Sequence, residues 1–208
     1  MTKALAPGLY GIADAGFGDP VEQGIQLADG GAEIIQLRAK HWTTAARTRA
    51  GLALVEHLRP RGVRVIMNDD LQAALASNAD GLHLGQDDGD LMTARSKLGA
   101  NAIVGRSTHS LAQAIEAATQ ADYIGFGPVF TTTTKRAAGT PRGLEVLEQV
   151  LRTVSLPVVA IGGIRLKHLP HLRRIGVRHW AVISDIMNEP DRVLRARRYR
   201  YVPATSTR

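Results

Sequence analysis

Eight short runs of consecutive apolar residues recur along the chain, and segments with apolar residues at every third or fourth position separate them. Continuous apolar runs of this length are typical of strands buried on both faces, and the longer spacing is typical of amphipathic helices. The predicted strands are residues 9–13, 32–37, 63–67, 81–84, 102–104, 123–126, 156–161 and 180–183. The predicted helices are residues 21–28, 43–58, 71–77, 91–98, 111–119, 143–154 and 166–175.

The alternation of strand and helix predicts an α/β fold in which the strands run parallel. Eight such units within 208 residues match a single (β/α)8 TIM barrel. An open doubly wound sheet is the alternative that the pattern leaves open. Because the length fits one domain, we expect a single barrel domain over residues 1–191, followed by an Arg-rich helix end and tail over residues 192–208.

The net charge of +7 is concentrated at the C-terminal end of the chain. Six arginines follow Asp191 with no acidic residue among them, whereas residues 1–191 carry 20 basic and 19 acidic side chains. We interpret this end as a solvated last helix and a frayed tail, and the alternative is contact with an anionic partner or a second subunit. The nearly neutral body argues against a nucleic-acid partner.

The composition also excludes several kinds of chemistry. The chain has no cysteine, which excludes disulfides, thiolate nucleophiles and Cys-ligated metals. No stretch approaches the roughly 18 apolar residues that span a bilayer, and the first 20 residues lack the apolar core of a signal peptide. We therefore expect a cytoplasmic protein without a membrane partner, and the sequence leaves a homo-oligomer open.

A basic cluster follows the second predicted strand. Gln36, Arg38 and Lys40 occupy alternate positions, so their side chains are expected to point to the same side. Arginine and lysine are strong donors to phosphate oxygens. The cluster therefore predicts a pyrophosphate site, with a solvated basic strand end as the alternative.

Carboxylates follow the next two predicted strands. Asn68 and Asp69 come after one strand, and Asp87 and Asp88 come shortly after the next. The C-terminal ends of parallel strands meet at one rim of a barrel, and Mg²⁺ prefers carboxylate, water and substrate phosphate oxygens. Asp69 and Asp88 thus predict a Mg²⁺ site. The alternatives are helix capping at Asn68 and Asp69, and a turn or helix N-terminus at Asp87 and Asp88.

Further polar segments follow the later strands. Ser107 follows the fifth strand, and residues 131–135, four threonines and a lysine, follow the sixth. Hydroxyls and an ammonium group suit a phosphate, although a flexible polar loop is the alternative. Gly163 and Ser184 follow the seventh and eighth strands, where many barrels bind phosphate. For His83, within a strand, we favour a structural or orienting role.

As a set, these segments resemble the thiamine phosphate synthase family. The shared motifs are Gln-Leu-Arg-x-Lys, Asn-Asp, His-x-Gly-Gln-x-Asp, Ser-x-His, Thr-x-Thr-Lys and Ile-Gly-Gly-Ile, which occur here in this order. The resemblance covers residues 9–186 and implies a TIM-barrel transferase of thiamine biosynthesis. Such an enzyme joins 4-amino-2-methyl-5-hydroxymethylpyrimidine pyrophosphate to a thiazole phosphate, with Mg²⁺, and releases thiamine phosphate and pyrophosphate.

The resemblance also implies roles for individual residues. The implied binders of the pyrimidine pyrophosphate are Gln36, Arg38, Lys40, Asn68, Ser107 and Lys135. The implied thiazole phosphate pocket contains Thr132, Thr133, Thr134, Gly163, Ile183 and Ser184. The implied Mg²⁺ ligands are Asp69 and Asp88, and the implied catalytic groups are Arg38, Lys40, Ser107 and Lys135.

The chain departs from the family pattern at a few positions, which are Arg106, Thr131, His179, Trp180 and Asp185. Asp185 lies next to the implied phosphate pocket and would repel a phosphate unless its side chain points away or pairs with an arginine. Two rival functions stay open. One is a thiazole tautomerase of the same barrel family, which needs neither metal nor pyrophosphate, and the other is a non-catalytic phospholigand-binding protein.

Overall fold

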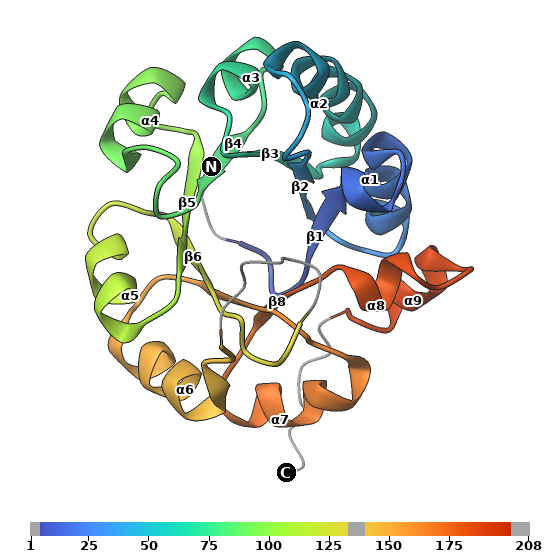
Figure 1. Cartoon of the computed structure of the whole chain (residues 1–208). Helices are drawn as coiled ribbons and strands as arrows, with labels where there is room; N and C mark the ends of the chain where they lie inside the picture. Colours follow the sequence, from blue (N-terminus) through green and yellow to red (C-terminus); the bar gives the residue numbers. More distant parts are fainter. Residues whose placement is uncertain (1–4, 133–139, 201–208) are drawn as a thin grey trace.

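Eight parallel strands form a closed barrel in chain order, in a computed structural model that describes residues 5–132 and 140–200. Figure 1 shows the barrel along its axis, with the helices forming an outer ring. The strands are β1 (Gly8–Asp14), β2 (Ile34–Arg38), β3 (Arg64–Asn68), β4 (Gly81–Leu84), β5 (Ile103–Thr108), β6 (Tyr123–Phe126), β7 (Val158–Ile161) and β8 (His179–Val182). All eight predicted strands are confirmed, and the closed order excludes the open sheet.

The helices alternate with these strands. The α-helices are α1 (Pro20–Asp29), α2 (Thr44–Leu58), α3 (Leu71–Ala76), α4 (Leu91–Leu98), α5 (Leu111–Ala117), α6 (Gly143–Thr153), α7 (Leu169–Arg174), α8 (Ser184–Met187) and α9 (Arg192–Arg197). Short 3-10 helices are η1 (Ala15–Phe17), η2 (Arg59–Arg61) and η3 (Leu166–His168). Within the described ranges, no helix combines the length and the apolar character that crossing a membrane requires.

Short polar residues cap the helices where the chain leaves the strands. Asp70 accepts a hydrogen bond from the Ala73 amide at the start of α3, and Asp90 accepts one from the Thr93 amide at the start of α4. Ser110 has the same role at the start of α5. Such caps satisfy amides that have no partner inside the helix. They explain why each chain segment turns at the rim within a few residues of the strand end.

The segment 166–175 differs from the single helix that was predicted. Residues Leu166–His168 form the 3-10 helix η3, and α7 begins only at Leu169. Pro170 lies in the first turn of α7, where its missing N–H group costs nothing. Deeper inside a longer α-helix, the same proline would remove a hydrogen bond and clash with the preceding turn. The proline therefore determines where the α-helix starts.

The hydrophobic core has two layers. Inside the barrel, side chains from alternate strand positions form a cluster that includes Tyr10, Ile34, Ile66, Ile103, Tyr123, Val159 and Ala181. Between the barrel and the helices lies a larger cluster that includes Leu37, Met67, Val104 and Trp180. Neighbouring strand residues thus face opposite layers, as the twofold periodicity of a strand requires. The interior cluster forms the base of the site described below.

The Arg-rich C-terminal helix α9 packs on α1 through Ala196, the one fully buried residue of this helix. A Cβ atom added at Gly30 would lie 2.3 Å from the Cβ atom of Ala196, so the close approach of the two helices requires a glycine there. Tyr199 is fully buried, and its carbonyl oxygen accepts a hydrogen bond from the Trp180 indole. The arginines of α9 therefore extend from a helix that is attached to the barrel.

Candidate active site

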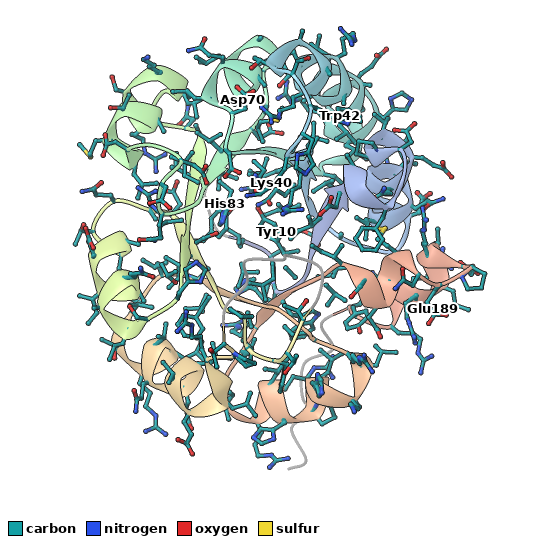
Figure 2. All side chains as sticks on the ribbon, in the orientation of Figure 1. Tyr10, Lys40, Trp42, Asp70, His83 and Glu189 are labelled. Atoms are coloured by element: carbon teal, nitrogen blue, oxygen red, sulfur yellow. The ribbon has the colours of Figure 1, made fainter. Side chains whose placement is uncertain are left out.

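An open cavity of about 150 Å³ lies at the C-terminal end of the barrel. Sequence-predicted residues that line it are Gln36, Arg38, Lys40, Asn68, Asp69, Asp88, Ser107, Thr132, Gly163, Ile183 and Ser184. In Figure 2 the side chains of Lys40, His83 and Tyr10 lie toward the barrel centre, whereas Trp42 and Glu189 lie toward the periphery. Thr133, Thr134 and Lys135 fall outside the described residues.

The basic arm of the site leaves β2 as predicted. Gln36, Arg38 and Lys40 all line the cavity, while Leu37 between them is buried in the outer core. The Lys40 ammonium lies 3.9 Å from a carboxylate oxygen of Asp69. The side-chain amide of Gln36 donates to the Tyr10 hydroxyl at 3.0 Å. The three side chains therefore lie in order from the interior of the barrel to its charged rim.

Arg38 is held by a buried carboxylate that sequence reasoning missed. Its guanidinium pairs with Asp14, which is 5% exposed and lies at the end of β1. Gln23 on α1 fixes Asp14 by accepting from its backbone amide at 2.9 Å and donating to its carbonyl oxygen at 3.1 Å. A buried ion pair of this kind orients the guanidinium more than it stabilises the fold. The carboxylate holds Arg38 in one place at the cavity wall.

Asp69 has a backbone conformation that is uncommon for a residue other than glycine. Its φ of 64° lies in the left-handed region, which a non-glycine residue adopts at a cost of about 1 kcal/mol or more. The helix-capping role falls instead to Asp70, so Asp69 is free to line the cavity. Asn68 donates a hydrogen bond to the Asp69 carboxylate. The capping alternative for Asn68 and Asp69 is therefore wrong.

The carboxyl groups of Asp69 and Asp88 lie against one another. Burial of Asp69, together with a hydrogen bond and charge repulsion from Asp88, raises the pKa of Asp69 to about 6. Asp88 also accepts a hydrogen bond from the Gly85 amide at 3.1 Å, so its turn role and its position at the cavity coexist. The helix N-terminus that follows is capped by Asp90, not by Asp88. Two close carboxylates, with the pKa of Asp69 raised, are an arrangement that a cation would relieve.

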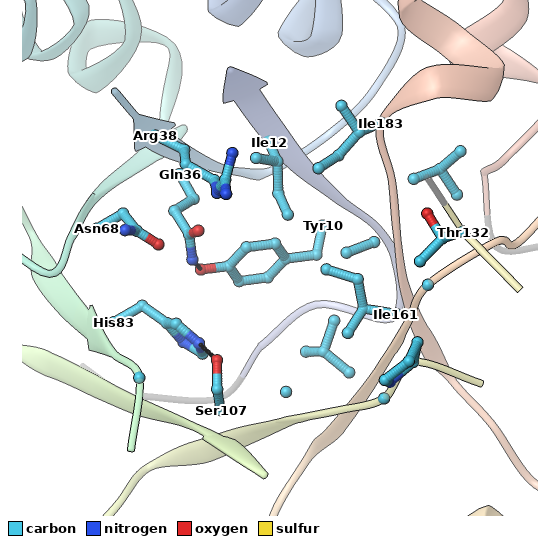
Figure 3. Close-up of a pocket in the computed structure, with 18 of the residues that line it drawn as sticks. Tyr10, Ile12, Gln36, Arg38, Asn68, His83, Ser107, Thr132, Ile161 and Ile183 are labelled. Atoms are coloured by element: carbon cyan, nitrogen blue, oxygen red, sulfur yellow. Dashed lines mark hydrogen bonds between the residues drawn. The ribbon is translucent and has the colours of Figure 1, made fainter. Parts of the chain in front are cut away.

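A hydrogen-bonded network forms the floor of the cavity. The hydroxyls of Tyr10 and Tyr123 are 2.6 Å apart, and the Tyr123 hydroxyl lies 2.9 Å from Nδ1 of His83. The other ring nitrogen of His83 lies 2.9 Å from the Ser107 hydroxyl, which is the dashed contact in Figure 3. Burial raises the pKa of both tyrosines, so both hydroxyls stay protonated. The tyrosine hydroxyls of the floor are therefore uncharged, and the network connects them to Ser107.

The sequence indicated the role of His83 but not that of the two tyrosines. The predicted orienting role of His83 agrees with its two ring contacts. The tyrosines were read only as members of apolar strands. The available signal was the alternation along β1 and β6, which places Tyr10 and Tyr123 on the inner side of the barrel.

The opposite wall of the cavity is built from β7, β8 and the segment after β6. Gly163 has a φ of 63°, and a Cβ atom there would lie 2.3 Å from the Thr131 carbonyl oxygen. Only a glycine allows the backbone to pass so closely below Thr132. In Figure 3, Ile183 and Thr132 lie on the same side of the pocket, across from Asn68 and His83. This wall has no described acidic side chain lining it.

The unusual residues around β8 lie away from the cavity. Asp185 accepts a hydrogen bond from Tyr199, and one of its carboxylate oxygens lies 3.5 Å from Nε of Arg195. The Asp185 carboxylate thus pairs with an arginine, and in this arrangement we do not expect it to repel a phosphate. His179 contacts the Leu5 carbonyl oxygen, and Trp180 is buried in the outer core. None of these three side chains lines the cavity.

The donor set at the rim fits a magnesium ion that is shared with a substrate. Among the described residues there is no group of three or more His, Cys, Asp or Glu side chains that would enclose a metal by themselves. Mg²⁺ keeps several water ligands and commonly binds through one or two carboxylates together with substrate phosphates. Asp69 and Asp88 supply two carboxylates, next to the cationic Arg38 and Lys40.

Comparisons with known proteins agree with this geometry. The sequence profile of the family described as thiamine monophosphate synthase matches residues 9–186. A thiamine-phosphate synthase from Chloroflexus aurantiacus is 40% identical over 196 residues, which cover 92% of this chain and 90% of that protein. One from Pelotomaculum thermopropionicum is 38% identical and covers 92% and 89%, respectively. The structure of thiamine phosphate pyrophosphorylase from Pyrococcus furiosus is similar with a TM-score of 0.85, 34% identity, and coverage of 95% of this chain and 94% of that one.

Proposed function

The chain belongs to the thiamine monophosphate synthase family, and we propose that it is a transferase that joins the pyrimidine pyrophosphate to a thiazole phosphate, giving thiamine phosphate and pyrophosphate. The observation that supports this most directly is the meeting of a cationic arm and a carboxylate pair above a neutral floor. A magnesium pyrophosphate suits the first two features, because it presents both a cation and phosphate oxygens. An uncharged heterocycle suits the floor of the cavity.

We assign the pyrimidine ring to the floor of the cavity. Gln36 and Ser107 are the proposed contacts, since both carry a side-chain donor and acceptor and both line the cavity near Tyr10. His83 keeps Ser107 in place through its ring nitrogen. The network beneath is saturated by its own hydrogen bonds, so it offers a rigid base.

We assign the pyrophosphate to the rim. Arg38 and Asn68 would bind its oxygens directly, and the Lys40 ammonium lies 3.9 Å from the Asp69 carboxylate. Asp69 and Asp88 are the proposed ligands of Mg²⁺. When bound, Mg²⁺ would neutralise charge on the phosphate oxygens as the pyrophosphate departs.

We assign the thiazole phosphate to the opposite wall. Thr132, Gly163, Ile183 and Ser184 border that part of the cavity. Thr133, Thr134 and Lys135, which lie outside the described residues, belong to the proposal through the family resemblance alone. The pairing of Asp185 with Arg195 supports this assignment, because it keeps the carboxylate away from an incoming phosphate.

The proposed chemistry is dissociative. The bond between the pyrimidine methylene carbon and the pyrophosphate oxygen breaks, and its electron pair leaves with the pyrophosphate. The lone pair of the thiazole nitrogen then forms the new carbon–nitrogen bond to the resulting cation. Because negative charge grows on the leaving group, Arg38 and Lys40 would stabilise the transition state more than the bound substrate. No step requires a general base.

The two rival functions fit the site less well. A tautomerase acting on the thiazole phosphate has no use for a carboxylate pair beside a lysine, which is what Asp69, Asp88 and Lys40 form. A non-catalytic phospholigand-binding protein would leave unexplained why the cavity joins a neutral floor to two phosphate-binding walls. Small-molecule substrates, a cytoplasmic location and the lack of a nucleic-acid partner remain parts of the proposal.

The test is a paired product assay. Purified protein receives the pyrimidine pyrophosphate and the thiazole phosphate with either Mg²⁺ or EDTA, while pyrophosphate is measured by a coupled assay and thiamine phosphate by mass. We expect equal amounts of both products, formed only with Mg²⁺. Isomerisation of the thiazole phosphate in EDTA without pyrophosphate release would instead establish the tautomerase, and binding without any turnover would establish the phospholigand-binding protein.

A further inference from the structure

Arg106 holds the segment that carries Asp88, although it does not itself line the cavity. It lies on β5 beside Ser107, and its position pairs with Leu84 at the end of β4. Its guanidinium donates from Nη1 to the Gly85 carbonyl oxygen and from Nη2 to the Gly89 carbonyl oxygen, the latter at 2.9 Å. These two carbonyls bracket residues 85–89, called the Asp88 loop below. The guanidinium thus bonds both ends of one short loop.

The Asp88 loop connects the two carboxylates of the rim. The amide of Gly85 donates to Asp88, and it also stabilises the charged form of Asp69. Gln86 adds a second attachment to β5 by donating to the Ser107 carbonyl oxygen. By holding the Gly85 carbonyl oxygen, Arg106 therefore restrains the residue whose amide serves both carboxylates.

Glycine at both ends makes the loop dependent on such an attachment. Gly89 has a φ of 124°, and a glycine segment has more backbone freedom to lose on ordering than any other. The planar guanidinium presents two N–H groups in a fixed fork, which suits two carbonyl oxygens at a set separation. An ammonium or an apolar side chain at this position cannot hold the two ends in the same way.

We infer that Arg106 is a positioning residue for the carboxylate pair, setting the separation at which Asp69 and Asp88 share one divalent cation. The inference rests on the proposed function, because it presumes the cation site. The direction in which metal affinity changes when Arg106 is replaced distinguishes a positioning role from a purely electrostatic one. The positive charge of Arg106 by itself repels a cation, so its removal without any loss of position would strengthen metal binding. If the two carboxylates lose their relative position instead, metal binding would become weaker.

The experiment measures Mn²⁺ binding to the full chain by electron paramagnetic resonance, without substrates. Removal of a supporting partner outside the ligand set commonly weakens metal binding by 10-fold or more, so we expect about tenfold weaker binding in Arg106→Leu. Arg106→Lys keeps the charge but not the fork, and we expect it to resemble Arg106→Leu. Hydrogen exchange of the Asp88 loop amides, measured without metal, should be faster in both variants.

Arg95→Leu is the matched control. Arg95 on α4 donates to the Ala102 carbonyl oxygen and pairs with Asp122 at 2.6 Å, at the end of the barrel opposite the cavity. Its removal should lower the melting temperature without changing Mn²⁺ affinity or exchange in the Asp88 loop. Full Mn²⁺ affinity in Arg106→Leu, or its recovery in Arg106→Lys, would overturn the inference. A wild-type protein that binds Mn²⁺ neither alone nor with added inorganic pyrophosphate would overturn the proposed cation site as well, so the two failures are distinguishable.

Discussion

Replacing Asp69 by asparagine should stabilise the metal-free protein at neutral pH. The pKa of Asp69 is raised from 3.8 to about 6, because burial and the neighbouring Asp88 disfavour its charged form. The folded state therefore carries a penalty whenever this carboxyl is ionised. Asparagine removes the charge, tolerates the φ of 64° at this position, and keeps an oxygen that can accept from Asn68.

The size of the effect follows from the pKa shift. A shift from 3.8 to about 6 corresponds to about 3 kcal/mol at 1.36 kcal/mol per pKa unit. The 3.9 Å contact with the exposed Lys40 lowers this pKa, and its effect is already contained in the net shift. We expect Asp69→Asn to raise the free energy of unfolding by about 1–3 kcal/mol above pH 7.

The pH dependence has a defined sign. Between pH 3.8 and 6 the folded protein binds a proton at Asp69 that the unfolded chain does not, so this group's contribution to stability decreases as the pH rises through that window. The advantage of Asp69→Asn should therefore be full above about pH 7 and absent near pH 4. Chemical denaturation in EDTA at both pH values measures it.

The neighbouring substitution Asp70→Asn is a control, for which we expect the opposite change in the free energy of unfolding. Burial acts to raise the pKa of Asp70, but the Ala73 amide and Arg47 outweigh it and lower the pKa below 3.8. The charged form of Asp70 thus stabilises the fold above that value, and its loss should destabilise the protein at neutral pH. A metal-free wild type that is as stable as Asp69→Asn at pH 7.5 would refute the reasoning about the carboxylate pair.

Three further predictions concern the floor and the phosphate walls. Tyr123→Phe should cost about 1–3 kcal/mol in chemical denaturation, because it removes a buried hydroxyl that contacts both Tyr10 and His83, and no change would mean that water replaces the hydroxyl. Gly163→Ala should raise KM for the thiazole phosphate much more than KM for the pyrimidine pyrophosphate in steady-state kinetics, since its Cβ atom would collide with a backbone carbonyl oxygen; equal changes would argue against the assigned wall. Lys135→Ala should lower kcat by roughly 100-fold, as removal of a charge donor does, and an unchanged kcat would remove Lys135 from the catalytic groups.

Much of the site was predictable because of the geometry of parallel strands. The eight apolar runs determined the barrel, and the barrel determined that residues directly after the strands share one rim. Gln36, Asp69, Ser107 and Gly163 lie on or just after four different strands and line one cavity for that reason. Such an inference needs only the order of the elements and the period of a strand.

The tertiary structure decided which of several similar side chains has which task. Asp69 and Asp70 are adjacent and chemically identical, yet the left-handed backbone at Asp69 sends one carboxylate to the cavity and leaves the other to cap α3. The partner Asp14 and the loop-holding Arg106 depend on contacts between segments that neither periodicity nor spacing describes. Local sequence determines the elements through backbone sterics and hydrophobic burial, whereas side-chain partners across the barrel depend on the distances and directions that exist only after the strands have closed.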